Sequence, residues 1–288
     1  MKYTESSKLN DKEFVDYFEE KVKKTIKDFK LFNKKDKILI AASGGKDSTA
    51  LLYLMKKLGY NVSAITVNSH IGCYSDENLT KLKKFCSDQK IKLNIISLRK
   101  EFGSSLCYII SVLESKGIKK TSCSVCGSLR RYLLNKYSKK LKADVLLTGH
   151  NLDDETNGAL VSLFSGNLKH VARIGPLIVN KGFIQKAKPF YFVFEDEVER
   201  YSKLNKFDVR YGLCPCSSSG ARRFYSELNI SNEKKFNLIN NILKNIPRLK
   251  KHYKSEGVKR CMNCKEPSSN SLCQTCKILS IVKDKQII

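Results

Sequence analysis

The pattern of apolar and polar residues passes from one amphipathic helix to an alternation of short strands and longer helices. Phe14, Phe18, Val22, Ile26 and Phe29 recur every three or four residues, which predicts an N-terminal helix that packs on the core. The pattern then predicts strands at 37–42, 61–67, 92–98 and 143–148, and helices at 46–58, 76–89, 106–116, 124–141 and 153–164. Strands that alternate with helices predict an α/β fold, with a parallel sheet covered on both faces.

The rest of the chain is less regular. Residues 170–192 contain Gly175-Pro176 and Lys188-Pro189, and we predict no bounded element there. Further on, the pattern predicts a helix at 194–206, a Cys-Pro-Cys turn at 214–216, helices at 221–228 and 231–246, and a compact cysteine-rich tail from 261.

Composition narrows the class of protein. The 288 residues include 54 Lys and Arg against 28 Asp and Glu, a formal charge of +26, which predicts a nucleic-acid partner. The alternative is a basic protein from an organism with Lys-rich usage. No apolar run approaches the ~20 residues of a membrane span, and the first residues do not form a secretory signal. Eleven cysteines, an odd number with two Cys-x-x-Cys pairs clustered near the C-terminus, suit reduced thiolates and a cytoplasmic protein.

The loop 43–48 (Ser-Gly-Gly-Lys-Asp-Ser) lies between a predicted strand and a predicted helix. Its two glycines let backbone N–H groups turn toward an anion, and the following helix adds free donors, its dipole and the Lys46 charge. The spacing differs from that of a Walker A loop. We therefore predict a compact loop that binds the phosphates of ATP.

The segment 149–155 (Gly-His-Asn-Leu-Asp-Asp-Glu) follows a predicted strand and opens a helix. Ligands of open parallel sheets bind beyond the carboxyl ends of the strands. Asp154 is therefore expected near ATP-bound Mg2+ or the reacting base, and His150 near the nucleotide. For Asp153 and Glu155, capping of the helix is an equal alternative.

Two groups of cysteines carry candidate chemistry. Cys123 and Cys126 lie one turn apart at the start of a predicted helix, and Cys214 and Cys216 lie in a later turn. Spacing leaves three interpretations: a three-cysteine iron–sulfur cluster with one free iron, a four-thiolate zinc site that includes Cys216, or a redox pair that carries a persulfide.

The tail carries two cysteine knuckles separated by eight residues. This spacing predicts a tetrahedral zinc site, without which so short a tail would not fold. The four predicted ligands are Cys261, Cys264, Cys273 and Cys276. Lone cysteines such as Cys107 are read as apolar filler.

Together, loop 43–48, the motif 123–127 (Cys-Ser-Val-Cys-Gly), segment 149–155, Cys214-Pro215 and the tail cysteines resemble the TtcA/TtuA family of tRNA thiolases. The similarity is greatest to the archaeal and eukaryotic cytoplasmic branch that makes 2-thiouridine at the wobble position. The fold implied is a PP-loop (adenine nucleotide alpha hydrolase-like) parallel sheet. The implied division is an N-terminal helix (1–34), a PP-loop ATP pyrophosphatase domain (35–215), C-terminal helices (216–255) and a zinc-binding module (256–288).

The resemblance also implies the reaction and the residues that carry it. ATP adenylates the 2-carbonyl of the wobble uridine (tRNA position 34), and sulfur held by a 4Fe-4S cluster replaces the oxygen. The implied catalytic residues are Asp154 and the cluster ligands Cys123, Cys126 and Cys214. The implied ATP-binding residues are Ala41, Ser43, Gly44, Gly45, Lys46, Asp47, Ser48, Gly149 and His150. Basic pairs near the cysteines, Arg130, Arg131, Arg222 and Arg223, are expected to contact tRNA.

Several alternatives remain at this point. The target could instead be uridine 54 or cytidine 32 of tRNA. A noncatalytic, zinc-dependent tRNA-binding scaffold and an ATP-dependent ligase that adds nitrogen are rivals of other classes. The sulfur donor, either sulfide or a sulfur-carrier protein, cannot be read from the residues, and the resemblance allows a homodimer. Cys216 stands where relatives tend to have an aromatic residue, which keeps the zinc alternative for the central cysteines open.

Overall fold

The computed structural model describes residues 3–212, 214–216, 228–253 and 257–283. A central sheet has the strand order β3-β2-β1-β4-β6-β5. Five strands are parallel, and only β5 runs antiparallel, against β6. The strands are β1 (Ile38–Ala41), β2 (Val62–Asn68), β3 (Leu93–Ser97), β4 (Val145–Leu147), β5 (Leu177–Ile178) and β6 (Gln185–Ala187). The predicted α/β fold with a mostly parallel sheet is confirmed.

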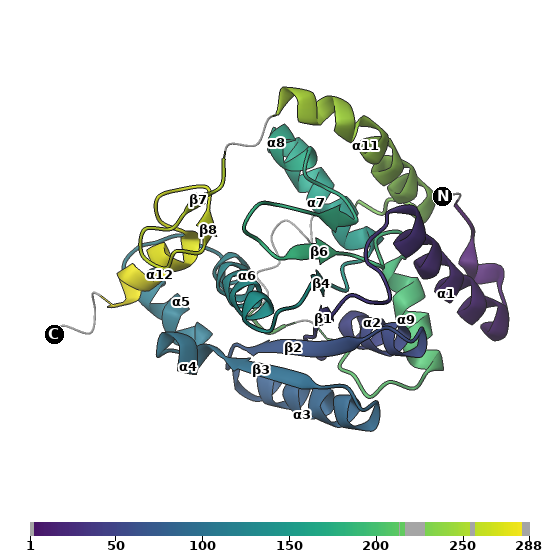
Figure 1. The fold of residues 1–288 in the computed structure, drawn as a ribbon, viewed down its shortest axis with the longest axis horizontal. Helices are drawn as coiled ribbons and strands as arrows, with labels where there is room; N and C mark the ends of the chain where they lie inside the picture. The colour runs from purple at the N-terminus through teal and green to yellow at the C-terminus, as the bar shows by residue number, and fades with distance from the viewer. Residues whose placement is uncertain (1–2, 213, 217–227, 254–256, 284–288) are drawn as a thin grey trace.

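Helices cover both faces of this sheet (Figure 1). Alternate strand residues point to opposite faces, so Ile38 and Ile40 pack toward one side while Leu39 packs toward the other. The first side is covered by α1 (Asp11–Asp28), α2 (Lys46–Lys57), α3 (Gly72–Asp88) and α9 (Glu195–Leu204). The second side is covered by α5 (Leu106–Ser115) and α6 (Ser122–Lys140), after the short α4 (Leu98–Phe102).

The N-terminal helix α1 belongs to the core, as its periodicity predicts. Phe14, Phe18, Val22 and Ile26 are buried, and the Phe18 ring stacks on Tyr201 of α9 at 4.2 Å between centroids. The helix follows a short 3-10 turn (Ser6–Lys8) and begins with a capping box.

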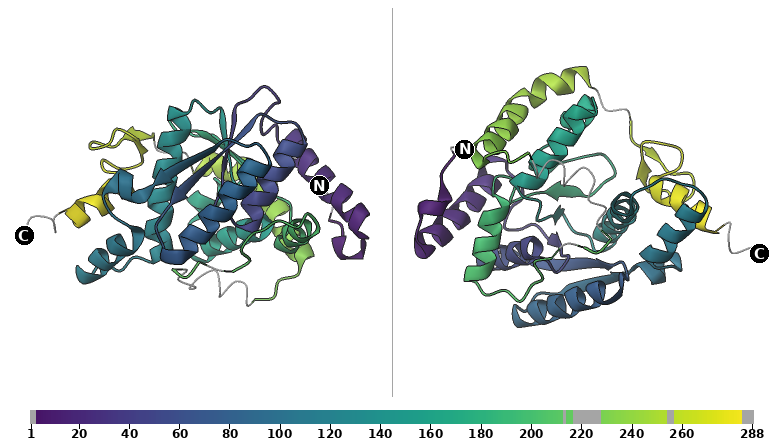
Figure 2. Two further views of the ribbon diagram at one scale, coloured as in Figure 1. Left: turned by 90° about the horizontal axis from the view of Figure 1, so that it is seen from below. Right: turned by 180° about the vertical axis from the view of Figure 1, so that it is seen from behind.

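A third apolar cluster joins α7 (Leu152–Phe164), α8 (Leu168–Val171) and α11 (Asn232–His252). The tail forms a two-stranded ribbon, β7 (Lys259–Arg260) and β8 (Pro267–Ser268), followed by α12 (Gln274–Lys283). Ile278 and Val282 of α12 pack with α5 and α6 on the second face of the sheet. In both further views the tail lies on the side of the molecule opposite α1 (Figure 2).

The structure differs from the sequence-based expectation in several places. Residues 170–192 contain the end of α8 together with β5 and β6, which no pattern indicated because these strands have only two and three residues. Helix α11 continues through Pro247 to His252, so the predicted end at 246 is wrong. Part of the tail is helical, as α12. The helix predicted at 221–228 falls almost entirely outside the described residues.

Candidate active site

The predicted phosphate loop joins the end of β1 to the start of α2, at the carboxyl edge of the sheet. Gly44 has φ +83°, and a Cβ there would lie 2.7 Å from the Asn78 carbonyl oxygen, so the position requires glycine. The loop is closed by Ser48, whose Oγ accepts from Ser43 N at 3.1 Å and donates to Gly45 O at 3.2 Å. Gly45 caps α2 without a side-chain hydrogen bond, which leaves the first N–H groups of the helix turned toward the loop.

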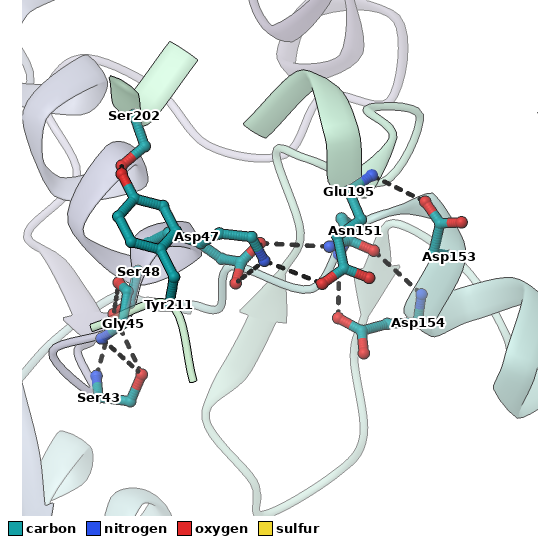
Figure 3. A network of polar contacts seen from close by, with 11 residues as sticks. Ser43, Gly45, Asp47, Ser48, Asn151, Asp153, Asp154, Glu195, Ser202 and Tyr211 are labelled. Atoms are coloured by element: carbon teal, nitrogen blue, oxygen red, sulfur yellow. Dashed lines mark hydrogen bonds and ion pairs between the residues drawn. The ribbon is translucent and has the colours of Figure 1, made fainter. Parts of the chain in front are cut away.

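Charged groups are concentrated beside this loop (Figure 3). Lys46 Nζ lies 2.9 Å from Glu195 Oε1 and 3.3 Å from Asp47 Oδ2. Desolvation opposes its charge, yet Asp47 and Glu195 raise the pKa of Lys46. Burial raises the pKa of Asp47, with a further contribution from Asp154, against the opposite effect of Lys46. Three carboxylates and one ammonium thus share a small space, the kind of environment in which a metal–phosphate complex is bound.

Segment 149–155 reaches the same place from β4. Gly149 allows close approach, since a Cβ there would lie 3.0 Å from the backbone carbon of Asp47. Asn151 donates from Nδ2 to Asp47 Oδ1 at 3.2 Å and caps α7 by accepting from Asp154 N at 3.0 Å. The Asp154 carboxylate in turn accepts from Asn151 N at 3.4 Å, which completes a capping box. The cap is therefore Asn151, while Asp153 instead pairs with Lys235 at 2.6 Å.

The remaining expected nucleotide residues border the loop less directly. Ala41 is half-buried at the end of β1. His150 is exposed, and its Nδ1 is 2.9 Å from Thr148 Oγ1.

One pocket joins the phosphate loop to the central cysteines. It has a volume of about 110 Å³. Its lining includes Ser43 from the loop, Cys126 and Arg130 from α6, and Cys214. Arg210, four residues before Cys214, forms an isolated parallel bridge with Gly45 of the loop. The predicted anion site and the predicted thiol site therefore open onto the same space.

Of the central cysteines, Cys126 and Cys214 line this pocket, whereas Cys123 and Cys216 do not. Cys126 Sγ lies 4.0 Å from Ser69 Oγ, and Cys123 Sγ lies 3.9 Å from the carbonyl oxygen of Cys216. Burial raises the pKa of Cys216 to about 11, and the neighbouring Cys107 and Cys214 add to the effect. Within the described ranges, only the tail offers three or more metal-ligating side chains within 4.8 Å. Cys107, assigned no chemistry from the sequence, lies beside this group.

The tail brings its four cysteines together as predicted. The sulfurs of Cys261, Cys264, Cys273 and Cys276 all lie within 4.8 Å of one another, a compact set suited to one tetrahedral ion. Burial opposes the thiolate, but backbone N–H groups of Cys264, Cys273 and Asn263 lower the pKa of Cys261 to about 6. Glu266 fixes the module on α6 by accepting from Asn135 Nδ2 and Lys139 Nζ, both at 2.7 Å.

The basic residues fall into two groups. Arg130 lines the shared pocket, and Arg131 lies on the adjoining surface of α6. Arg222 and Arg223 lie outside the described residues. No helix in the described part of the chain is long and apolar enough to cross a bilayer.

Sequence reasoning missed two members of the site. Glu195 is brought to Lys46 by the start of α9, and Asn78 packs under Gly44 from α3. The acidic residues in the first turn of α9 are typical of a helix N-terminus, but nothing in the sequence indicates that they face the loop. Asn78 belongs to no sequence motif that would have indicated its place in the site.

Comparison with known proteins agrees with this geometry. Residues 15–211 match the family model of the PP-loop domain. The tRNA-5-methyluridine(54) 2-sulfurtransferase of Pyrococcus horikoshii is 34% identical over 282 residues, covering 96% of this chain and 89% of the relative. Cytoplasmic tRNA 2-thiolation protein 1 of Caenorhabditis elegans is 28% identical, covering 91% and 72%.

A solved structure is similar over nearly its whole length. The U34-tRNA thiolase NcsA of Methanococcus maripaludis, solved with its 4Fe-4S cluster, aligns with a TM-score of 0.77 and 27% identity, covering 100% of this chain and 94% of that one. From the matched domain and these relatives, we conclude that the chain belongs to the PP-loop domain family and, within it, to the TtcA/TtuA family indicated by its motifs.

Proposed function

We propose that this protein is an ATP-dependent tRNA 2-thiolase. The observation that carries the proposal is the single pocket lined by Ser43 of the phosphate loop together with Cys126 and Cys214. A nucleotide activated at the loop and a sulfur held by the cysteines would meet there. Relatives named as tRNA 2-thiolation enzymes support the assignment of RNA as the substrate, as does the charge of +26.

The chemistry needs both halves of the pocket. A uracil 2-carbonyl oxygen is a poor leaving group. Its attack on the α-phosphate of ATP releases pyrophosphate and converts the oxygen into part of AMP. Hydrosulfide then adds to C2 and AMP departs, so one oxygen is exchanged for one sulfur without a change in redox state.

Residues of the chain supply binding and positioning for these steps. The N–H groups of loop 43–48 and the first turn of α2 would bind the phosphates, with Lys46 neutralising charge. Asp47 and Asp154 are oxygen ligands suited to Mg2+ beside those phosphates. Asp154 would act next to the target base, and Asn151, which bonds both Asp47 and the backbone N of Asp154, would keep the two acids in register.

The donor set of the central site fits a cluster better than a single ion. A cubane is larger than one metal, so its cysteines stand farther apart than zinc ligands, in keeping with the contrast between the central cysteines and the tail. Cys123, Cys126 and Cys214 would hold a 4Fe-4S cluster, which when bound supplies an open iron site for hydrosulfide. The tail cysteines would hold Zn2+ as a structural ion.

The wobble uridine is our proposed target, as in the U34 thiolase of similar structure. Uridine 54 is the second candidate, because relatives at 34% and 30% identity are named for that position. Either sulfide or a sulfur-carrier protein would deliver sulfur to the same pocket. A noncatalytic tRNA-binding scaffold is the rival of another class, and it predicts zinc without iron in the purified protein.

The test is mass spectrometry of tRNA nucleosides from cells that lack the protein. We expect 2-thiouridine derivatives to disappear and to return with the wild-type gene but not with Asp154→Asn. Nuclease fragments of single tRNAs then assign the loss to the anticodon loop or the T-loop. An unchanged nucleoside profile in the deletion strain refutes the function.

A further inference from the structure

Two cations face each other across α6 and β6, next to the central cysteines. Ile184 N donates to Asn135 Oδ1 of α6 at 3.0 Å, which fixes the strand against the helix. Arg131 precedes Asn135 by about one helical turn, about 6 Å, and Lys186 follows Ile184 by two residues of extended chain, about 7 Å. This register places Arg131 level with Lys186, on the face of the sheet where Ile184 packs with α6. Figure 1 shows α6 beside the sheet.

Neither cation is paired with a carboxylate in the described part of the chain. Arg131 and Lys186 have no ion pair or hydrogen bond within the part of the chain that the structure describes, whereas nearby Lys188 is paired with Glu155 at 2.7 Å. Burial and the charges of Arg131 and Lys188 lower the pKa of Lys186. Arg131 is exposed to solvent, yet the protein atoms around its guanidinium desolvate it, as expected for a side chain in a concave surface. Such an arrangement is costly unless an anion binds there.

Gly127 positions Arg131. The guanidinium folds back along α6, and a Cβ at position 127 would lie 2.8 Å from one of its nitrogens. In that position Arg131 interacts electrostatically with the Cys126 sulfur. Glycine within a helix costs stability relative to alanine, so its presence here calls for a reason. Because Gly127 has no side chain, the Arg131 guanidinium can lie against it, and this explains the glycine.

We propose that Arg131 and Lys186 together hold a backbone phosphate of the RNA, next to the nucleotide that enters the pocket. The inference rests on the proposed function and extends it to a defined contact. The planar fork of Arg131 suits two phosphate oxygens, and Lys186 adds a point charge from the opposite side. Cys126 lines the pocket and interacts electrostatically with Arg131, so a phosphate held by Arg131 would lie near the nucleotide that enters the pocket.

The experiment measures binding of an unmodified tRNA transcript to the full-length, anaerobically purified protein at several salt concentrations. Arg131→Gln and Lys186→Gln are each expected to weaken binding about tenfold at low salt and to lower the salt slope by about one. Lys24→Gln, which removes an exposed charge on α1, is the control and should change neither quantity. If both site variants bind like Lys24→Gln, the proposal is overturned.

Gly127→Ala separates positioning from folding. The melting temperature of the Gly127→Ala variant should not fall, because alanine favours the helix. The variant should nevertheless bind tRNA more weakly, because the new methyl group displaces Arg131. In the Arg131→Gln background it should have no further effect, because it acts only through that side chain. An additive loss in the double variant contradicts the proposal.

The two cations could instead bind the pyrophosphate released from ATP, which offers the same phosphate oxygens. Competition by inorganic pyrophosphate tests this alternative. If Arg131→Gln weakens competition by pyrophosphate but not tRNA binding, the cations hold the leaving group and the RNA contact is refuted. Failure of the whole function would look different, since wild-type protein would then restore no thiolated nucleoside to the deletion strain. Normal thiolation with unaltered tRNA binding by the variants would refute the phosphate site alone.

Discussion

Asn151 donates its side-chain amide to the Asp47 carboxylate across 3.2 Å, and so connects the start of α7 to the phosphate loop. The same side chain caps α7 through Asp154 N. The two acidic groups proposed to work on ATP and on the base are therefore set relative to each other by one residue.

Replacing Asn151 with alanine should cost about 1 kcal/mol of stability through the lost cap. It should also lower ATP turnover in the presence of tRNA by about tenfold or more, because Asp47 and Asp154 lose their common partner. The matched control is Asn10→Ala, which removes the equivalent capping box of α1, where Asn10 Oδ1 accepts from Glu13 N at 3.0 Å. Denaturant unfolding and pyrophosphate release measure the two effects. Equal loss of turnover in both variants would contradict the role of Asn151.

Asp154→Asn keeps the size of the side chain but removes its charge. We expect thiolation to fall by about 100-fold or more with little change in melting temperature. Asp16→Asn, which removes an exposed carboxylate on α1, is the control. Thiolated nucleoside formed per enzyme in vitro is the readout. Comparable activity in the two variants would show that Asp154 serves only as a cap.

Gly44→Ala should abolish ATP binding. Its φ is +83° and the Asn78 carbonyl oxygen lies 2.7 Å from the place that a Cβ would take, so the loop must change shape to admit a side chain. Gly158→Ala, within α7 and with open space around it, should instead raise the melting temperature by a few degrees and bind ATP normally. Calorimetric titration with a nonhydrolysable ATP analogue tests both, and tight binding to Gly44→Ala would show that the loop is not the phosphate site.

Metal content should separate the two cysteine groups. Cys264→Ser is expected to lose about one zinc per chain and keep iron, because it removes one of four tail thiolates. Cys123→Ser is expected to lose iron and keep zinc. Elemental analysis of anaerobically purified protein gives both numbers. Zinc at both sites in the wild type would favour the four-thiolate alternative for the central cysteines.

Asp47→Asn should make the protein without ligand more stable at neutral pH. Burial and Asp154 raise the pKa of Asp47 above its unfolded value, so folding favours the protonated acid and stability falls as pH rises through that pKa. The asparagine variant loses this pH dependence and the ability to bind Mg2+–ATP. Asp208→Asn should act in the opposite direction and only weakly, because Lys81 lowers the pKa of this exposed acid. The free energy of unfolding of the wild type and both variants, measured between pH 4 and pH 8, tests these expectations.

Much of this architecture follows from local patterns. Residues close in the sequence determine the strand, loop and helix around Ser43 to Ser48, the cysteine spacings and the amphipathic α1. The structure confirms the secondary structure of these segments and brings the tail sulfurs together. The roles assigned to the individual nucleotide and cluster residues remain predictions.

The missed features depend on contacts between distant segments. Strands β5 and β6 have only two and three residues and are defined by pairing rather than by propensity. The link from Lys46 to Glu195 spans 149 residues, and Asn78 becomes part of the site only because α3 packs under Gly44. No periodicity records such approaches, since tertiary packing decides them.

Helix α6 begins with Cys123 and Cys126 and supports, through Asn135 and Lys139, the Glu266 side chain of the cysteine-rich tail. These hydrogen bonds join the helix that carries the two central cysteines to the tail that carries four more, well over one hundred residues later in the chain. Because we propose zinc in the tail and a cluster on α6, we expect a cell short of zinc to lose modified tRNA even with abundant iron and ATP, which would make translation by this route sensitive to two trace metals at once.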